Sequence, residues 1–129
     1  MSGKGPIVLD SSAWVEILGR GALSKTCEKE LNSASRVVVP TVVHYEVYKK
    51  ITAAFSDDRA LSATAAMSQH ETRDLTREIA LLAADLSLQH RLGMADAIVL
   101  AHAHAVEATL ITLDNDFAGI PGARVIRKQ

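Results

Sequence analysis

Residues 6–14, PIVLDSSAW, join a short apolar strand to the start of a helix. Pro6–Leu9 is an unbroken apolar run, which is typical of a strand buried on both faces of a parallel sheet. Asp10 ends this run, and from Ser11 to Leu18 the apolar side chains fall on one helical face. The chain therefore begins with a buried strand that places a carboxylate at its end, directly before a helix.

The rest of the chain repeats this alternation. We expect further strands at Val37–Val39, His70–Asp74, Thr109–Leu113 and Ala123–Ile126, the last at a sheet edge. We expect helices over residues 22–34, 41–55, 56–67, 75–92 and 95–107, with Thr41 as the N-cap of the second of these and Gly93 ending the fourth. This order predicts an α/β fold with a mostly parallel sheet of about four or five strands, covered by helices on both faces. We expect one domain over residues 1–129, with residues 1–4 as candidates for disorder.

The composition fits a small domain without a strong overall charge. Of the 129 residues, 48% are apolar and only 4% aromatic, and the net charge is −1. The core should be aliphatic, and contacts with nucleic acid must come from local patches or bound metal. The single cysteine, Cys27, cannot form an internal disulfide and fits a reducing compartment. No apolar run approaches the roughly 20 residues of a membrane span, so we expect a cytoplasmic protein without a membrane partner.

Four acidic residues stand in hydrophobic stretches where a carboxylate is disfavoured. The stretches IVLDSS, TVVHYEV, GMADAIVL and LITLDND contain Asp10, Glu46, Asp96 and Asp114. Asp10 and Asp114 each end a predicted strand, and ligand sites of open α/β sheets form at that edge. If the acids converge to about 4–5 Å, each pair repels by ~3–4 kcal/mol at an effective dielectric near 20. Oxygen ligands of this kind suit Mg²⁺, with Mn²⁺ as a second candidate, so the set predicts metal-dependent cleavage of a phosphodiester.

Each acid also has a simpler structural interpretation. Asp10, Asp96 and Asp114 stand where helix caps, Asx-turns or first-turn acids are common. Glu46 fits an acid at the margin of an apolar helix stripe, reaching for water. Taken singly, capping is the favoured interpretation of Asp10 and Asp114, and only the set of four favours a metal site.

The ordered motifs VLDSSAW, VPTVVHYEV, GMADAIVLAHA and LITLDNDF resemble those of the PIN-domain nucleases, most closely the VapC-type toxins of toxin–antitoxin pairs. The resemblance covers essentially the whole chain. It implies a three-layer α/β/α fold, Mg²⁺-dependent ribonuclease activity, a homodimer and a small antitoxin that blocks the site. The family's acidic quartet falls on the four carboxylates above, and Asp116 matches a further acid. Ser12 stands where such toxins often have Asn, and we expect its hydroxyl to tune the site.

The combined expectation is a metal-dependent endoribonuclease. Asp10 and Asp96 would bind Mg²⁺ most directly. Asp114, with Asp116 near it, would complete that shell or hold a second ion. Glu46 would orient or deprotonate the attacking water, leaving a 5′-phosphate and a 3′-hydroxyl. Two alternatives stay open: a PIN-like RNA- or protein-binding module without turnover, and a structure-specific DNA nuclease.

Charge also predicts the partners. An acidic pocket invites an Arg or Lys from the antitoxin, and a groove around residues 41–68 could hold an apolar antitoxin helix. Lys49 and Lys50 follow Glu46 by one turn; a solvated helix face is the default interpretation, and phosphate contacts beside the metal are the functional one. The five histidines form no zinc-binding motif and are expected to be core or surface residues.

Overall fold

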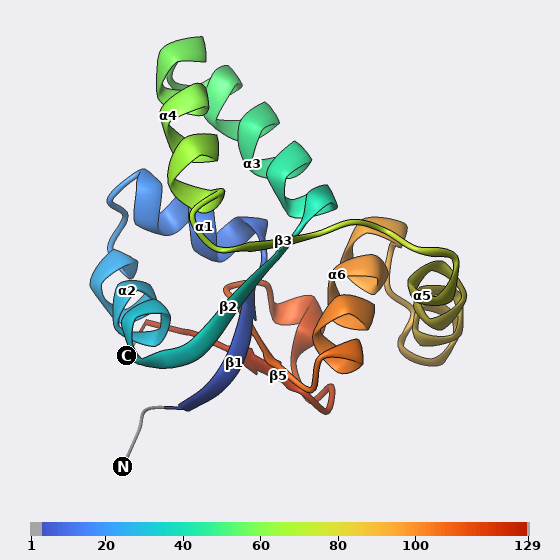
Figure 1. Ribbon diagram of the computed structural model, residues 1–129. Helices are drawn as coiled ribbons and strands as arrows, with labels where there is room; N and C mark the ends of the chain where they lie inside the picture. Colours follow the sequence, from blue (N-terminus) through green and yellow to red (C-terminus); the bar gives the residue numbers. More distant parts are fainter. Residues whose placement is uncertain (1–3, 129) are drawn as a thin grey trace.

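The computed structural model describes residues 4–128, arranged as helices on both sides of a central sheet (Figure 1). The sheet contains β1 (Lys4–Leu9), β2 (Ala34–Pro40), β3 (Glu71–Arg73), β4 (Thr109–Thr112) and β5 (Ala123–Val125). The helices are α1 (Ser11–Leu18), α2 (Ser24–Ser33), α3 (Thr41–Ala54), α4 (Asp57–Met67), α5 (Arg77–His90) and α6 (Met94–Ala105), followed by the 3₁₀ turn η1 (Asn115–Phe117). The predicted three-layer α/β/α architecture is confirmed.

The sheet has the strand order β3-β2-β1-β4-β5, and every pairing is parallel. The chain moves outward from β1 through β2 to β3, then returns to the other side of β1 for β4 and β5. The strand order thus reverses between β1 and β4, where Leu9 is in register with Ile111. Such a switch point opens a crevice at the carboxyl ends of its two strands.

The aliphatic core lies between the sheet and its helices. Val8, Val38 and Leu110, from the three central strands, are fully buried, as their near-continuous apolar sequences predict. Helix α6 is apolar almost all round and packs against β1, β2 and β4 as well as α3 and α5, which explains its central position. Figure 1 shows α1 and α2 on one side of the sheet, α5 and α6 on the other, and the α3–α4 pair extending beyond it. Within residues 4–128, no helix is long and apolar enough to cross a membrane.

Several predicted boundaries were wrong. Ala34 is the first residue of β2 and not the end of a helix. Pro40, not Thr41, is the N-cap of α3, and no side chain caps that helix. Helix α5 ends at His90, and its C-cap is Arg91, which adopts the left-handed conformation with φ 58°, whereas Gly93 is the N-cap of α6. Of the residues predicted to be disordered, Lys4 belongs to β1, and residues 1–3 lie outside the described residues, as does residue 129.

Candidate active site

Asp10 leaves the carboxyl end of β1 and becomes the N-cap of α1. Its Oδ1 accepts hydrogen bonds from the Ala13 backbone N–H, at 3.1 Å, and from the Ser12 hydroxyl, at 2.6 Å. Its Oδ2 accepts a hydrogen bond of 2.5 Å from Thr112 Oγ1. The side chain is only 6% exposed. This burial raises the pKa of the Asp10 carboxyl, while the hydrogen bonds from Ser12, Thr112 and Ala13 oppose the rise.

Thr112, the last residue of β4, is a part of the site that the sequence analysis missed. It is fully buried, and its hydroxyl donates to Asp10 while accepting the Asp114 backbone N–H at 2.9 Å. Ser12 Oγ makes a parallel link by accepting the Leu113 N–H at 3.0 Å. These hydroxyls join the start of α1 to the end of β4. The available signal was a polar residue at a buried strand position, two residues before an acid.

Asp96, Asp114 and Asp116 form the tightest acidic group. One carboxylate oxygen from each lies within 4.8 Å of the others. Asp96 lies in the first turn of α6, and Asp114 is the N-cap of η1, where its Oδ1 accepts the Asp116 N–H at 2.8 Å. The capping interpretation therefore holds for Asp114, as it does for Asp10, and does not conflict with a place in an acidic cluster.

The environment of Asp96 shows that all five acids converge. Burial raises its pKa from 3.8 to about 6, and the rise is increased by the charges of four neighbours, in order of effect Asp114, Asp10, Glu46 and Asp116. Glu46 reaches this group from α3, which packs against α6, and is half-buried beside the buried Val43 and Val47. A half-buried carboxylate surrounded by four others is strongly disfavoured in its ionised form.

The donors fit a hard divalent cation. They are carboxylate oxygens from the start of α6 and from the segment that follows β4, the ligand type that Mg²⁺ and Mn²⁺ prefer. Within the described part of the chain, this is the only group of three or more acidic, histidine or cysteine side chains close enough to share a metal. Of the histidines, His102 is a core residue, only 4% exposed. The structure thus brings together every acid that the sequence analysis selected, although Asp10 and Glu46 lie outside the tight group of three.

Comparison with known proteins identifies the family. Residues 7–123 match the sequence profile of the PIN domain. The chain belongs to the PIN-domain family. No curated protein matches the chain closely enough to add to this assignment.

Solved structures with the fold of this PIN domain include several toxins. A toxin–antitoxin complex from Klebsiella pneumoniae is similar with a TM-score of 0.77 and 24% identity, over 92% of this chain and 96% of that one. VapC20 of Mycobacterium tuberculosis, described as a Sarcin-Ricin loop cleaving toxin, is similar with a TM-score of 0.74 and 18% identity, over 89% of this chain and 95% of that one. VapBC2 of Rickettsia felis, bound to a fragment of its promoter DNA, is similar with a TM-score of 0.73 and 18% identity, over 94% of this chain and 97% of that one. At these identities the similarity shows a shared fold over nearly the full length.

Proposed function

We propose that this PIN domain is a Mg²⁺-dependent endoribonuclease that acts as the toxin of a toxin–antitoxin pair. The observation that carries the proposal is the grouping of Asp96, Asp114 and Asp116 within 4.8 Å of one another, with the charges of Asp10 and Glu46 also acting on Asp96, whose pKa burial and these four neighbours raise to about 6. A protein that kept this cluster without a cation would carry a permanent electrostatic cost. The similar fold of a toxin that cleaves the Sarcin-Ricin loop supports RNA as the substrate.

The side chains divide into ligands and supports. Asp96, Asp114 and Asp116 would hold Mg²⁺ together with Asp10. When bound, the ion would lower the pKa of a coordinated water and offset charge on the phosphate.

The supporting side chains keep the ligands in place and handle the proton. The Ser12 and Thr112 hydroxyls fix both oxygens of Asp10 and prevent the carboxylate from rotating. Glu46, on a different helix, would accept a proton from the attacking water at its carboxylate. Cleavage in this way leaves a 5′-phosphate and does not use the 2′-hydroxyl, so the chemistry alone would also permit a DNA substrate.

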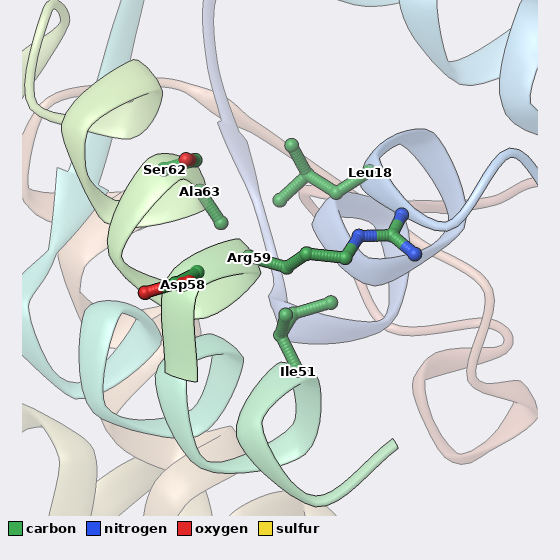
Figure 2. Close-up of a pocket in the computed structure, with 6 residues that line it drawn as sticks. All are labelled: Leu18, Ile51, Asp58, Arg59, Ser62 and Ala63. Carbon is green, nitrogen blue, oxygen red and sulfur yellow. The ribbon is translucent and has the colours of Figure 1, made fainter. Parts of the chain in front are cut away.

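The proposed partner is a small antitoxin, which the similar toxin–antitoxin complex from Klebsiella pneumoniae supports. A groove of about 380 Å³ lies between α1, α3 and α4, and the aliphatic side chains of Leu18, Ile51 and Ala63 line it from these three helices (Figure 2). The Arg59 side chain extends across it from α4 towards α1. This shape would suit one apolar face of an antitoxin helix.

The groove lies within reach of the acidic cluster. Helix α1 runs from Asp10, at its N-cap, to Leu18 in its last turn, a length of about 12 Å at 1.5 Å per residue. An extended segment of about four residues covers that distance. An antitoxin helix seated on Leu18 could therefore place a following Arg or Lys among the carboxylates. We also propose a homodimer and a single domain over residues 1–129, following the family pattern.

The proposed activity is tested by RNA cleavage with purified protein freed of its partner. Asp10→Asn and Glu46→Gln should each reduce the cleavage rate by roughly 10²-fold or more, while Asp85→Asn, an exposed acid on α5, should not change it. RNA and DNA of one sequence, assayed side by side, separate a ribonuclease from a DNA nuclease. Full activity in folded Asp10→Asn would contradict the assignment, and RNA binding without any cleavage by the wild type would favour a binding module.

A further inference from the structure

Lys50 places a positive charge at the border of the acidic cluster. It follows Glu46 by one helical turn and so lies on the same side of α3. Its Nζ donates a hydrogen bond of 3.1 Å to Ser11 Oγ, and Ser11 is the buried residue next to Asp10. Within residues 4–128, Lys50 forms no ion pair with any of the nearby acids. The ammonium is thus held by the neutral hydroxyl of the residue that follows Asp10, and it is able to bind an anion.

A groove begins on the neighbouring side of α3. Its volume is about 610 Å³, and its walls, built mainly from α3 with Thr64 of α4, are almost entirely apolar. Two tyrosines line it and remain exposed, Tyr45 by 63% and Tyr48 by 40%. Lys49 Nζ lies 5.7 Å from the centre of the Tyr45 ring. Large exposed aromatic surfaces of this kind need a reason in a soluble domain.

The polar atoms of the groove's two threonines face away from it. The hydroxyl oxygens of Thr52, on α3, and Thr64, on α4, are buried and have no hydrogen-bond partner among the described residues. A flat, largely apolar occupant would therefore match the tyrosine surfaces, and a negative charge attached to it would match the ammonium groups of Lys49 and Lys50.

We propose that this groove, lined by Tyr45, Tyr48, Lys49 and Thr52, seats an unpaired base of the RNA strand, while Lys50 contacts a phosphate next to the cleaved bond. The proposal rests on the ribonuclease function above and names the part of the substrate that the protein grips. A base offers a π-face for stacking and a polar edge, and single-stranded RNA is bound by aromatic stacking beside positive charge. Tyr45 directly precedes Glu46, so the groove borders the acidic cluster across α3, and one strand can occupy both.

The test uses binding without cleavage, in EDTA, followed by fluorescence anisotropy. The probes are a labelled single-stranded oligoadenylate of about 12 nucleotides and a strand of equal length without bases. Tyr45→Ala should weaken binding of the oligoadenylate by roughly tenfold and leave binding of the baseless strand unchanged, whereas Tyr45→Phe should retain wild-type affinity. Lys50→Met should weaken both and reduce the slope of log K against log salt concentration by about 0.7, the effect of one lost phosphate contact. Leu88→Ala, which removes an even more exposed large apolar side chain from α5, is the control.

Unchanged oligoadenylate affinity in Tyr45→Ala, or equal weakening of both probes, would overturn the inference. So would conversion of a wild-type dimer to a monomer by Tyr45→Ala in sedimentation, because the groove would then be filled by a second copy of the chain. Metal-dependent cleavage by the wild type is measured separately. If that cleavage is absent while the base-dependent effect of Tyr45 persists, the nuclease function fails and the binding groove stands.

Discussion

Replacing Asp96 by Asn should stabilise the metal-free protein, although it removes a residue of the proposed active site. The pKa of Asp96 is raised from 3.8 to about 6 by burial and by four neighbouring carboxylates. Without solvent screening, this pKa shift corresponds to a loss of about 3 kcal/mol in the free energy of unfolding when Asp96 is ionised. Because the side chain is only half-buried, solvent screening reduces this loss to ~1.5 kcal/mol. Asp96 also gains ~0.5 kcal/mol from its place in the first turn of α6. The net expectation for Asp96→Asn is a gain of ~1 kcal/mol, or about 4 °C in Tm for a chain of this length.

The sign of the pH dependence follows from linkage. Because the pKa is higher in the folded state, folded protein binds more protons than unfolded protein between 3.8 and about 6. Wild-type stability therefore falls as the pH rises through that window. The gain in Asp96→Asn should be complete above about pH 7 and should shrink towards zero as the pH falls below 3.8.

The assay is thermal unfolding in EDTA at about pH 7.5, repeated in acid and then with millimolar Mg²⁺. Asp85→Asn, which removes an exposed acid from α5, is the control and should leave Tm unchanged. Mg²⁺ should raise the Tm of the wild type more than that of Asp96→Asn, since bound cation offsets the repulsion only where the ligand is present. A Tm for Asp96→Asn at or below that of the wild type in EDTA would refute the reasoning that the cluster is electrostatically strained without metal.

Three further predictions concern the surrounding structure. Thr112→Val should lower the free energy of unfolding by ~2 kcal/mol, because Asp10 loses a buried hydrogen bond. Urea unfolding measures this, with Thr112→Ser as the control, which keeps the hydroxyl, loses only a buried methyl group and should cost about half as much or less. Burial lowers the pKa of His102 below its usual 6.5, so in an Asp96→Asn background the urea midpoint should fall as the pH drops through and below 6.5. Adding His102→Leu to Asp96→Asn should make this fall in the urea midpoint smaller. An equal fall with and without His102→Leu would show that another group titrates. Arg91→Gly should raise the free energy of unfolding by ~0.5–1 kcal/mol, because glycine adopts the left-handed conformation at this helix end without steric strain; a lower urea midpoint would contradict this.

The sequence predicted the acids better than the arrangement that supports them. Asp10, Glu46, Asp96 and Asp114 were selectable because each breaks an apolar pattern, and parallel strands bring the ends of β1 and β4 together. Thr112 was not selected, because threonine is common in strands and gives no contrast of its own. Its role depends on the register that places the end of β4 beside Asp10, a long-range pairing that no local pattern encodes.

The helix ends show the same limit. Gly93 looked like a helix terminator, yet the left-handed residue is Arg91, and Gly93 instead precedes α6. A glycine between two predicted helices indicates a break between them, but it does not show whether it ends the first helix or precedes the second. The start of β2 at Ala34 was also hidden, because the next two residues, Ser35 and Arg36, are polar and exposed.

The chemistry of the RNA ends tests the central claim most directly. Purified wild-type protein and Asp96→Asn would be incubated with a structured RNA pool in Mg²⁺, in Mn²⁺ and in EDTA, and the products analysed at both new ends. Cleavage by a metal-activated water predicts discrete products with a 5′-phosphate and a 3′-hydroxyl, formed only by the wild type and only with metal. Products ending in a 2′,3′-cyclic phosphate, or products formed equally in EDTA or by Asp96→Asn, would contradict the proposal.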